Sequence, residues 1–119
     1  MGLSYVTVSL KAVAHKKSYT ANFLADTGAT DTLAPAAALR KVGITPIGKT
    51  AYELADGSLQ DYEFGLAEIS FMGEITAGRV IFGPDSVEPL LGVTALESVG
   101  ITVDPANRTL KRLPAIPLK

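Results

Sequence analysis

The chain has 119 residues, 47% hydrophobic and 19% charged, which suits one domain with one hydrophobic core and excludes a disordered chain. Eleven Lys and Arg against twelve Asp and Glu give a net charge of −1, which disfavours a nucleic-acid binder. Cysteine is absent and His15 is the single histidine, so disulfide frameworks, thiolate metal sites and multi-histidine metal centres are excluded.

The chain shows no membrane or export signal. No apolar run reaches the roughly 18 residues of a membrane span, and residues 1–5 do not begin a signal peptide. We therefore expect a cytoplasmic protein with no membrane partner. We expect one domain over residues 1–119, with a core at about 5–110 and a basic, proline-containing tail at 111–119.

Gly, Pro, Asn and Asp divide the chain into short segments rich in β-branched and aromatic residues. This pattern predicts an all-β fold with one or two short helices. Near-alternation of polar and apolar residues predicts strands at 3–10 and 19–25, joined by a turn at 14–18. The basic residues of that turn are expected to form a solvated tip without a function: His15, Lys16 and Lys17.

A short helix on the surface is predicted next. Pro35 suits the first helical position, good helix formers follow it, and Gly43 comes after the last of them. Two extended arms then lie around Asp56-Gly57 within residues 50–62. Because Asp-Gly between extended segments is typical of a two-residue hairpin turn, we expect such a hairpin here.

Residues 64–81 are expected to form a second strand pair that turns at Met72-Gly73-Glu74 and breaks at Gly83-Pro84-Asp85. A second short helix should begin near Val93 and end at Gly100.

Thr94 and Glu97 have the spacing of a capping box for this second helix. The segment 101–110 is predicted to be a hairpin whose turn is 104–107, with Pro105 second and Asn107 able to adopt a left-handed conformation.

The most informative carboxylate is Asp26. It follows the apolar run Phe23-Leu24-Ala25 directly and precedes Thr27-Gly28-Ala29, so an acid stands at the end of a buried strand. An ionised carboxylate there needs hydrogen-bond donors, which a threonine hydroxyl and closely approaching backbone N–H groups can supply. Asp26 is therefore the candidate catalytic residue.

Three motifs in this order resemble the retropepsin-like family, the retroviral-type aspartic proteases, over roughly residues 5–110. The run from Phe23 to Ala29 is similar to the active-site motif of the family. Leu90-Leu91-Gly92 before a helix is similar to its second motif, and the hairpin at Asp56-Gly57 is similar to its flap. The resemblance implies a closed β-barrel, an acid protease half-domain, in a stand-alone, single-domain cellular member.

The activity that the resemblance implies is that of an aspartic endopeptidase without a metal or organic cofactor. One Asp-Thr-Gly motif gives half of a carboxylate dyad, so two copies of Asp26 would meet in a homodimer and share a proton. The resemblance assigns catalytic roles to Asp26, Thr27 and Gly28. It assigns substrate contacts to Gly28, Ala29, Thr30, Asp31, Ala55, Asp56, Gly57 and Ser58.

The expected substrate is an extended peptide or protein with apolar residues beside the scissile bond, cleaved best at mildly acidic pH. Leu90, Leu91 and Gly92 are expected to pack behind the catalytic loop as support. Two positions depart from the retroviral pattern: Val93 replaces an arginine, and Thr30 replaces the acid with which that arginine pairs. That ion pair cannot form here.

Two other functions are compatible with the same residues. The first is a catalytically silent, dimeric retropepsin-like module for peptide binding or assembly, which would keep its peptide affinity after Asp26→Asn. The second is an unrelated small β-barrel in which Asp26-Thr27-Gly28 forms a simple turn, since this tripeptide arises by chance in about 2–3% of chains this long.

Overall fold

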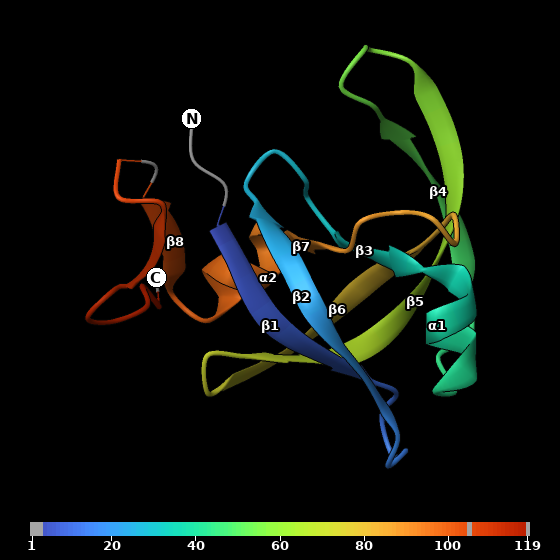
Figure 1. Cartoon of the computed structure of the whole chain (residues 1–119), viewed down its shortest axis with the longest axis horizontal. Helices are drawn as coiled ribbons and strands as arrows, with labels where there is room; N and C mark the ends of the chain where they lie inside the picture. Colours follow the sequence, from blue (N-terminus) through green and yellow to red (C-terminus); the bar gives the residue numbers. More distant parts are fainter. Residues whose placement is uncertain (1–3, 105, 119) are drawn as a thin grey trace.

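The computed structural model describes residues 4–104 and 106–118, and a closed β-barrel is its main feature (Figure 1). Six strands form the ring in the order β1-β2-β7-β3-β6-β5, which a further pairing of β1 with β5 closes. The predicted all-β barrel with two short helices is therefore confirmed. The strands are β1 (Ser4–Lys11), β2 (Ser18–Asp26), β3 (Thr32–Pro35), β4 (Gly48–Glu53), β5 (Leu59–Phe71), β6 (Glu74–Gly83), β7 (Leu90–Gly92), β8 (Ile101–Asp104) and β9 (Thr109–Arg112).

The barrel interior is built by alternate residues of the strands. Val8 and Leu10 of β1 and Phe23 of β2 are each 0% exposed. On β5, Ala67, Ile69 and Phe71 are buried while the residues between them are not. Because side chains in a strand point alternately to opposite faces, this spacing places one face of each strand in a shared hydrophobic core.

Helix α1 (Ala36–Lys41) is not the surface connection that its sequence predicts. Its Leu39 is 0% exposed and belongs to the main core, so the helix packs against the barrel. Pro35 is the N-cap, so the helix begins at Ala36, one position later than predicted. Gly43 has φ +87°, a left-handed conformation that favours glycine and ends the helical segment as predicted.

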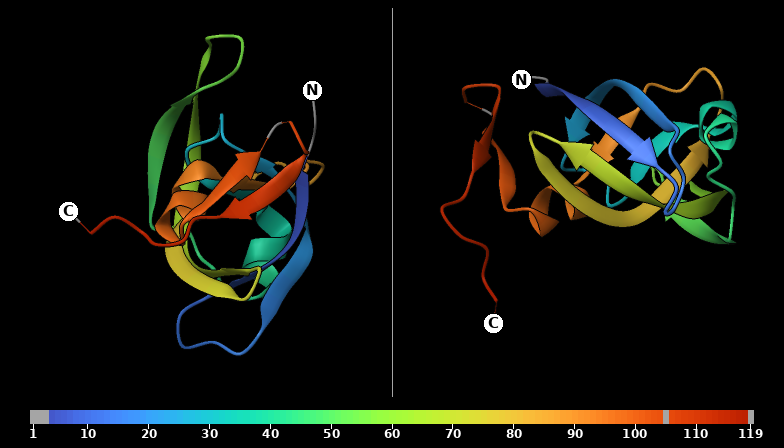
Figure 2. Two further views of the ribbon diagram at one scale, coloured as in Figure 1. Left: turned by 90° about the vertical axis from the view of Figure 1, so that its left-hand side faces the viewer. Right: turned by 90° about the horizontal axis from the view of Figure 1, so that it is seen from below.

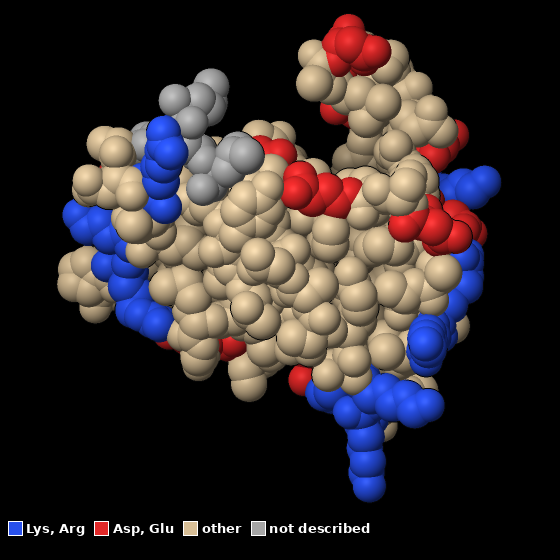
Figure 3. Space-filling model, in the orientation of Figure 1, with Lys and Arg blue, Asp and Glu red and all other residues tan. Residues whose placement is uncertain are grey.

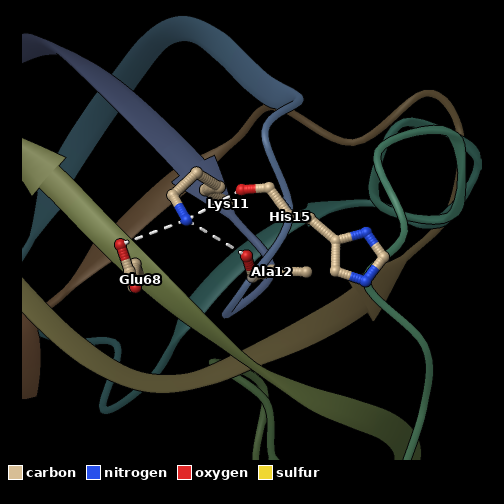
Figure 4. Close-up of polar contacts among 4 residues, drawn as sticks. All are labelled: Lys11, Ala12, His15 and Glu68. Carbon is tan, nitrogen blue, oxygen red and sulfur yellow. Dashed lines mark hydrogen bonds and ion pairs between the residues drawn. The ribbon is translucent and has the colours of Figure 1, made fainter.

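The basic turn between β1 and β2 is held by hydrogen bonds from Lys11 (Figure 4). The Lys11 ammonium donates to the carbonyl oxygens of Ala12 at 3.3 Å and His15 at 2.9 Å, and lies 3.5 Å from the Glu68 carboxylate on β5. The His15 ring packs so closely on Gly43 that an added Cβ there would lie 2.8 Å from Nδ1. These contacts give the turn a structural explanation.

Strand β5 is longer than expected, because it joins one arm of the predicted hairpin to the first strand of the next pair. Its residues 59–63 pair only with β4, so this β4–β5 hairpin projects beyond the ring (Figures 1 and 2). At Gly65, where β5 enters the ring, an added Cβ would lie 2.6 Å from the Thr45 carbonyl oxygen. Glycine therefore permits the close passage of the two chain segments.

The turn of this hairpin differs from the predicted two-residue turn. Leu54 N donates to the Ser58 carbonyl oxygen at 2.8 Å and Gly57 N donates to the Leu54 carbonyl oxygen at 2.9 Å. Within the turn only Gly57 has a positive φ, +86°, whereas a two-residue type I′ turn needs two such residues. The loop therefore has three residues, with Gly57 at its left-handed position. The two-residue form occurs instead at Met72-Gly73, where both φ values are positive.

Helix α2 (Val93–Ser98) follows β7 and ends, as predicted, before Gly100, which has φ +72°. Its N-cap is Gly92 and no side chain caps it, so the predicted capping box of Thr94 and Glu97 does not form. Backbone carbonyl groups take this role instead, as described below. In the part of the chain that the structure describes, α1 and α2 have six residues each, too few to span a membrane.

Strands β8 and β9 form a separate two-stranded sheet beside the barrel (Figure 2). Asp104 accepts hydrogen bonds from the backbone N–H groups of Ala106 and Asn107, but Arg108, with φ +56°, takes the left-handed position expected of Asn107. Pro105, the predicted second residue of this turn, lies outside the described residues. Strand β9 extends two residues into the predicted tail, and Arg112 there pairs with Glu74.

Candidate active site

The carboxylate of Asp26 stands at the end of a barrel strand. Asp26 is the last residue of β2 and lies opposite Gly92 in the parallel pairing of β2 with β7. Its side-chain oxygen Oδ1 accepts a hydrogen bond of 2.9 Å from Gly28 N, and its carbonyl oxygen accepts one of 3.1 Å from Ala29 N. The tight turn through Asp26-Thr27-Gly28-Ala29 therefore orients the carboxylate with its own backbone donors.

Glycine at position 28 keeps space beside this carboxylate. A Cβ added there would lie 3.2 Å from Asp26 Oδ1, tighter than ordinary van der Waals contact. Thr27 and Gly28 are exposed, whereas Asp26 is half-buried. The loop thus presents an open side at which another peptide chain can approach the carboxylate.

The loop that follows Asp26 is bonded to the start of α2. Val93 N donates to the Ala29 carbonyl oxygen at 2.8 Å and Thr94 N donates to the Thr30 carbonyl oxygen at 3.2 Å. The first N–H groups of a helix have no partner within the helix, so these carbonyl groups satisfy them. In return, α2 fixes the position of the loop.

Gly92 packs directly behind the same loop. Its N–H donates to the hydroxyl oxygen of Thr32, a residue that is 1% exposed, at 3.2 Å. An added Cβ at Gly92 would lie 2.5 Å from the carbonyl carbon of Asp31 and 2.7 Å from the carbonyl oxygen of Thr30. Only glycine leaves room for this approach, which places Gly92 behind the loop as the resemblance implies.

A cleft of about 680 Å³ opens between this loop and the β4–β5 hairpin. Figure 3 shows the hollow under the projecting hairpin, with acidic side chains on the hairpin and beside the hollow. The lining residues carry three carboxylates, those of Asp26, Asp31 and Glu53, and neither Lys nor Arg occurs among the described residues that line it. The cleft therefore has a negative electrostatic potential. Apolar walls come from Leu33, Leu54, Ile81 and Leu90.

A hydrogen bond connects the two sides of the cleft. The Tyr52 hydroxyl on β4 donates to Asp31 Oδ2 at 2.7 Å, and both residues are half-buried. Burial first, and then the hydrogen bond to Asp31 and its negative charge, raise the pKa of Tyr52 to about 12, although the nearby Arg79 opposes this shift. The hydroxyl therefore keeps its proton at neutral and acidic pH.

The structure brings most of the predicted site residues to this cleft. Its lining includes Asp26, Gly28, Ala29, Thr30, Asp31 and Ala55. Thr27 and the hairpin-tip residues Asp56, Gly57 and Ser58 are not part of the lining. At the tip, the hydroxyl and backbone N–H of Ser58 donate to Asp56 and hold its pKa below the ordinary value.

Tyr52 and Tyr62 line the cleft but are not among the predicted site residues; they lie on the hairpin strands with ring centres 6.3 Å apart. Thr50 pairs with Tyr62, so Tyr62 shares a face with Thr50 and Tyr52. The predicted two-residue turn would shift this register by one and place the two tyrosines on opposite faces. The turn type is therefore the signal that would have revealed the pair.

The chain matches a known protein family. A family model described as aspartyl protease matches residues 10–95, which include the loop of Asp26, the β4–β5 hairpin and β7. A comparison with curated proteins gave no match. Among the described residues, no three His, Asp or Glu side chains gather in a way that could hold a metal ion.

Proposed function

Because the chain belongs to the retropepsin-like aspartyl protease family, we propose that it is an endopeptidase that acts as a homodimer with Asp26 of each copy as its catalytic dyad. The observation that carries this proposal is the position of Asp26. Its carboxylate, oriented by Gly28 N, lines a cleft of about 680 Å³ whose opposite side is the β4–β5 hairpin. The catalytic residue and a binding surface therefore occur together.

Two copies are needed because carboxylate-dyad hydrolysis uses two carboxylates, and the chain has one Asp-Thr-Gly motif. At a separation of about 3 Å the two carboxylates cannot both ionise, so they share one proton and titrate as a unit. The exposed Thr27-Gly28 side of the loop is available to a second copy.

In the proposed mechanism, the ionised Asp26 removes a proton from a water molecule, whose oxygen attacks the peptide carbonyl carbon. The protonated Asp26 of the other copy donates its proton to the carbonyl oxygen. When the tetrahedral intermediate collapses and its C–N bond breaks, the Asp26 that took the water proton donates it to the leaving amine nitrogen, and Asp26 of the other copy accepts a proton from a hydroxyl group of the intermediate. The two carboxylates thereby exchange their roles as base and acid.

Substrate binding uses the shape and walls of the cleft. An extended peptide can lie between the loop and the β4–β5 hairpin and form backbone hydrogen bonds as an added strand. The apolar walls favour apolar side chains beside the scissile bond, through residues such as Leu33 and Ile81.

The test is cleavage of a diverse peptide library at about pH 4–7, detected by mass spectrometry, because a shared proton on the dyad requires mildly acidic conditions. We expect wild type to cut, and Asp26→Asn and a pepstatin-type inhibitor to abolish cutting. Asp85→Asn is the matched control, since Asp85 is exposed, does not line the cleft and accepts a bond from Ala37 N that Asn can also accept. No cleavage by wild type would contradict the proposal, and peptides that both wild type and Asp26→Asn bind without cleavage would favour a binding module.

A mixing experiment tests the shared dyad. If subunits exchange at random, a roughly ninefold excess of Asp26→Asn should lower wild-type turnover to about one tenth, because most wild-type chains then have an inactive partner. An equal excess of the double variant Asp26→Asn/Asp85→Asn should act in the same way. Turnover that is unaffected by the excess would show that each chain works alone.

A further inference from the structure

The β4–β5 hairpin is attached to the active-site loop through a single side-chain hydrogen bond among the described residues. This is the bond of 2.7 Å from the Tyr52 hydroxyl to Asp31 Oδ2. Asp31 lies five residues after Asp26, on the loop that carbonyl bonds at Ala29 and Thr30 tie to α2. The bond therefore joins the projecting hairpin to the loop that α2 holds in place.

Contacts on the barrel side of Tyr52 hold both strands of the hairpin. Arg79 of β6 donates to the Thr50 hydroxyl oxygen at 3.0 Å and lies 4.0 Å above the Phe64 ring centre, a cation–π distance. The Tyr62 ring packs beside the Tyr52 ring. Aromatic rings have few rotatable bonds, so a hydroxyl fixed this way loses little freedom when it donates to Asp31.

Above Tyr52 the hairpin has only local hydrogen bonds among the described residues. Leu54, Gly57 and Ser58 bond within the turn, and Asp56 accepts only from Ser58. The residues from Glu53 to Asp61 are all exposed. The Tyr52–Asp31 bond is therefore the last attachment before the free end of the hairpin, and it has the position of a pivot.

We propose that Tyr52 is a positioning residue that sets the height of the hairpin over Asp26 through its hydrogen bond to Asp31. This inference rests on the proposed function for its effect on substrate, but not for its effect on the free protein. Without the hydroxyl, the hairpin is less ordered before substrate binds. A peptide that needs the hairpin in place then binds more weakly, because part of its interaction energy orders the hairpin.

The first test uses amide hydrogen exchange of residues 51–59 in the free protein and needs no activity. Tyr52→Phe removes one oxygen and keeps the ring, and it should make these amides exchange about tenfold faster, because a hydrogen bond to a charged acceptor is lost. Tyr19→Phe is the matched control: Tyr19 packs on Phe23, far along β2 from the cleft lining, and should leave the rates unchanged. Equal rates in Tyr52→Phe and wild type would refute the inference.

The second test separates positioning from direct contact with substrate. For a cleaved peptide, Tyr52→Phe should raise KM about tenfold and change kcat much less. In the background of Asp31→Ala, the added Tyr52→Phe should have almost no further effect, because the bond is already absent. Effects that multiply would show that Tyr52 acts on substrate itself and would overturn the positioning role.

The two proposals fail in different ways. If no peptide is cleaved by wild type, the proposed function fails, while the exchange rates still decide whether Tyr52 holds the hairpin. If peptides are cleaved but the exchange rates of Tyr52→Phe match those of wild type, only the inference fails. Unfolding midpoints check that each variant is folded: the midpoint of Tyr19→Phe should match wild type, and that of Tyr52→Phe should fall by no more than the loss of one hydrogen bond explains.

Discussion

Gly92 offers a sharp test of how the loop of Asp26 is supported. Its backbone has φ −79° and ψ 162°, which any residue adopts, so Gly92→Ala introduces no backbone strain. The added Cβ would instead meet three backbone atoms at 2.5 to 2.7 Å, all in Thr30 and Asp31. Backbone atoms cannot rotate away as side chains can, so the loop or the start of α2 must move.

The size of the effect follows from three contributions. Overpacking of a well-packed site destabilises by about 1–3 kcal/mol. Movement of α2 weakens the bonds from Val93 and Thr94 to the loop, worth about 1 kcal/mol each. Replacing glycine restricts the unfolded chain and returns about 0.4–1 kcal/mol. The net expectation is a loss of about 2–4 kcal/mol in the free energy of unfolding.

The assay is urea denaturation followed by circular dichroism, with Gly78→Ala as the matched control. An added Cβ at Gly78 meets nothing within 4 Å, and its φ is not positive, so this variant should match or slightly exceed wild-type stability. A Gly92→Ala variant within about 0.5 kcal/mol of wild type would refute the packing argument, because this is the usual scatter of harmless substitutions.

Two further predictions concern single polar groups. Thr32→Val removes the acceptor for Gly92 N and leaves a buried N–H unpaired, so it should lower the free energy of unfolding by about 1–3 kcal/mol. Thr32→Ser keeps the hydroxyl oxygen and should lose less stability, and equal urea midpoints for the two variants would contradict this role of Thr32. Since folding raises the pKa of Tyr52 from 10.0 to about 12, the folded state holds this proton more tightly than the unfolded state. The contribution of this proton to the free energy of unfolding is complete below pH 10 and decreases as pH rises to 12. The urea midpoint should therefore decline less steeply above pH 10 in Tyr52→Phe than in wild type, and parallel declines would count against the raised pKa of Tyr52.

Features that depend on neighbouring residues in the chain could be predicted from the sequence. Alternation of apolar residues predicts β1 and β2, and the ends of both helices follow from Gly43 and Gly100, whose positive φ values suit glycine. The motif around Asp26 is equally local, because the strand, the carboxylate and its donor Gly28 N lie within a few residues. These features could be predicted because their causes are short-range.

Other features were decided only by the tertiary structure. The start of α2 is satisfied by carbonyl groups of Ala29 and Thr30 rather than by Thr94 and Glu97, and these partners are more than 60 residues away in the chain. Leu39 is buried because the barrel wall passes beside α1, which its short helical pattern does not reveal. Local propensity cannot anticipate a partner that the path of the chain supplies.

The β4–β5 hairpin depends on both local sequence and tertiary structure. Asp56-Gly57 predicts a turn correctly, but one residue of difference in loop length decides which face each following side chain occupies. That choice places Tyr52 and Tyr62 on one face and allows Tyr52 to reach Asp31. The register of β4 against β5, which the sequence predicts wrongly by one residue, therefore decides the shape of the site.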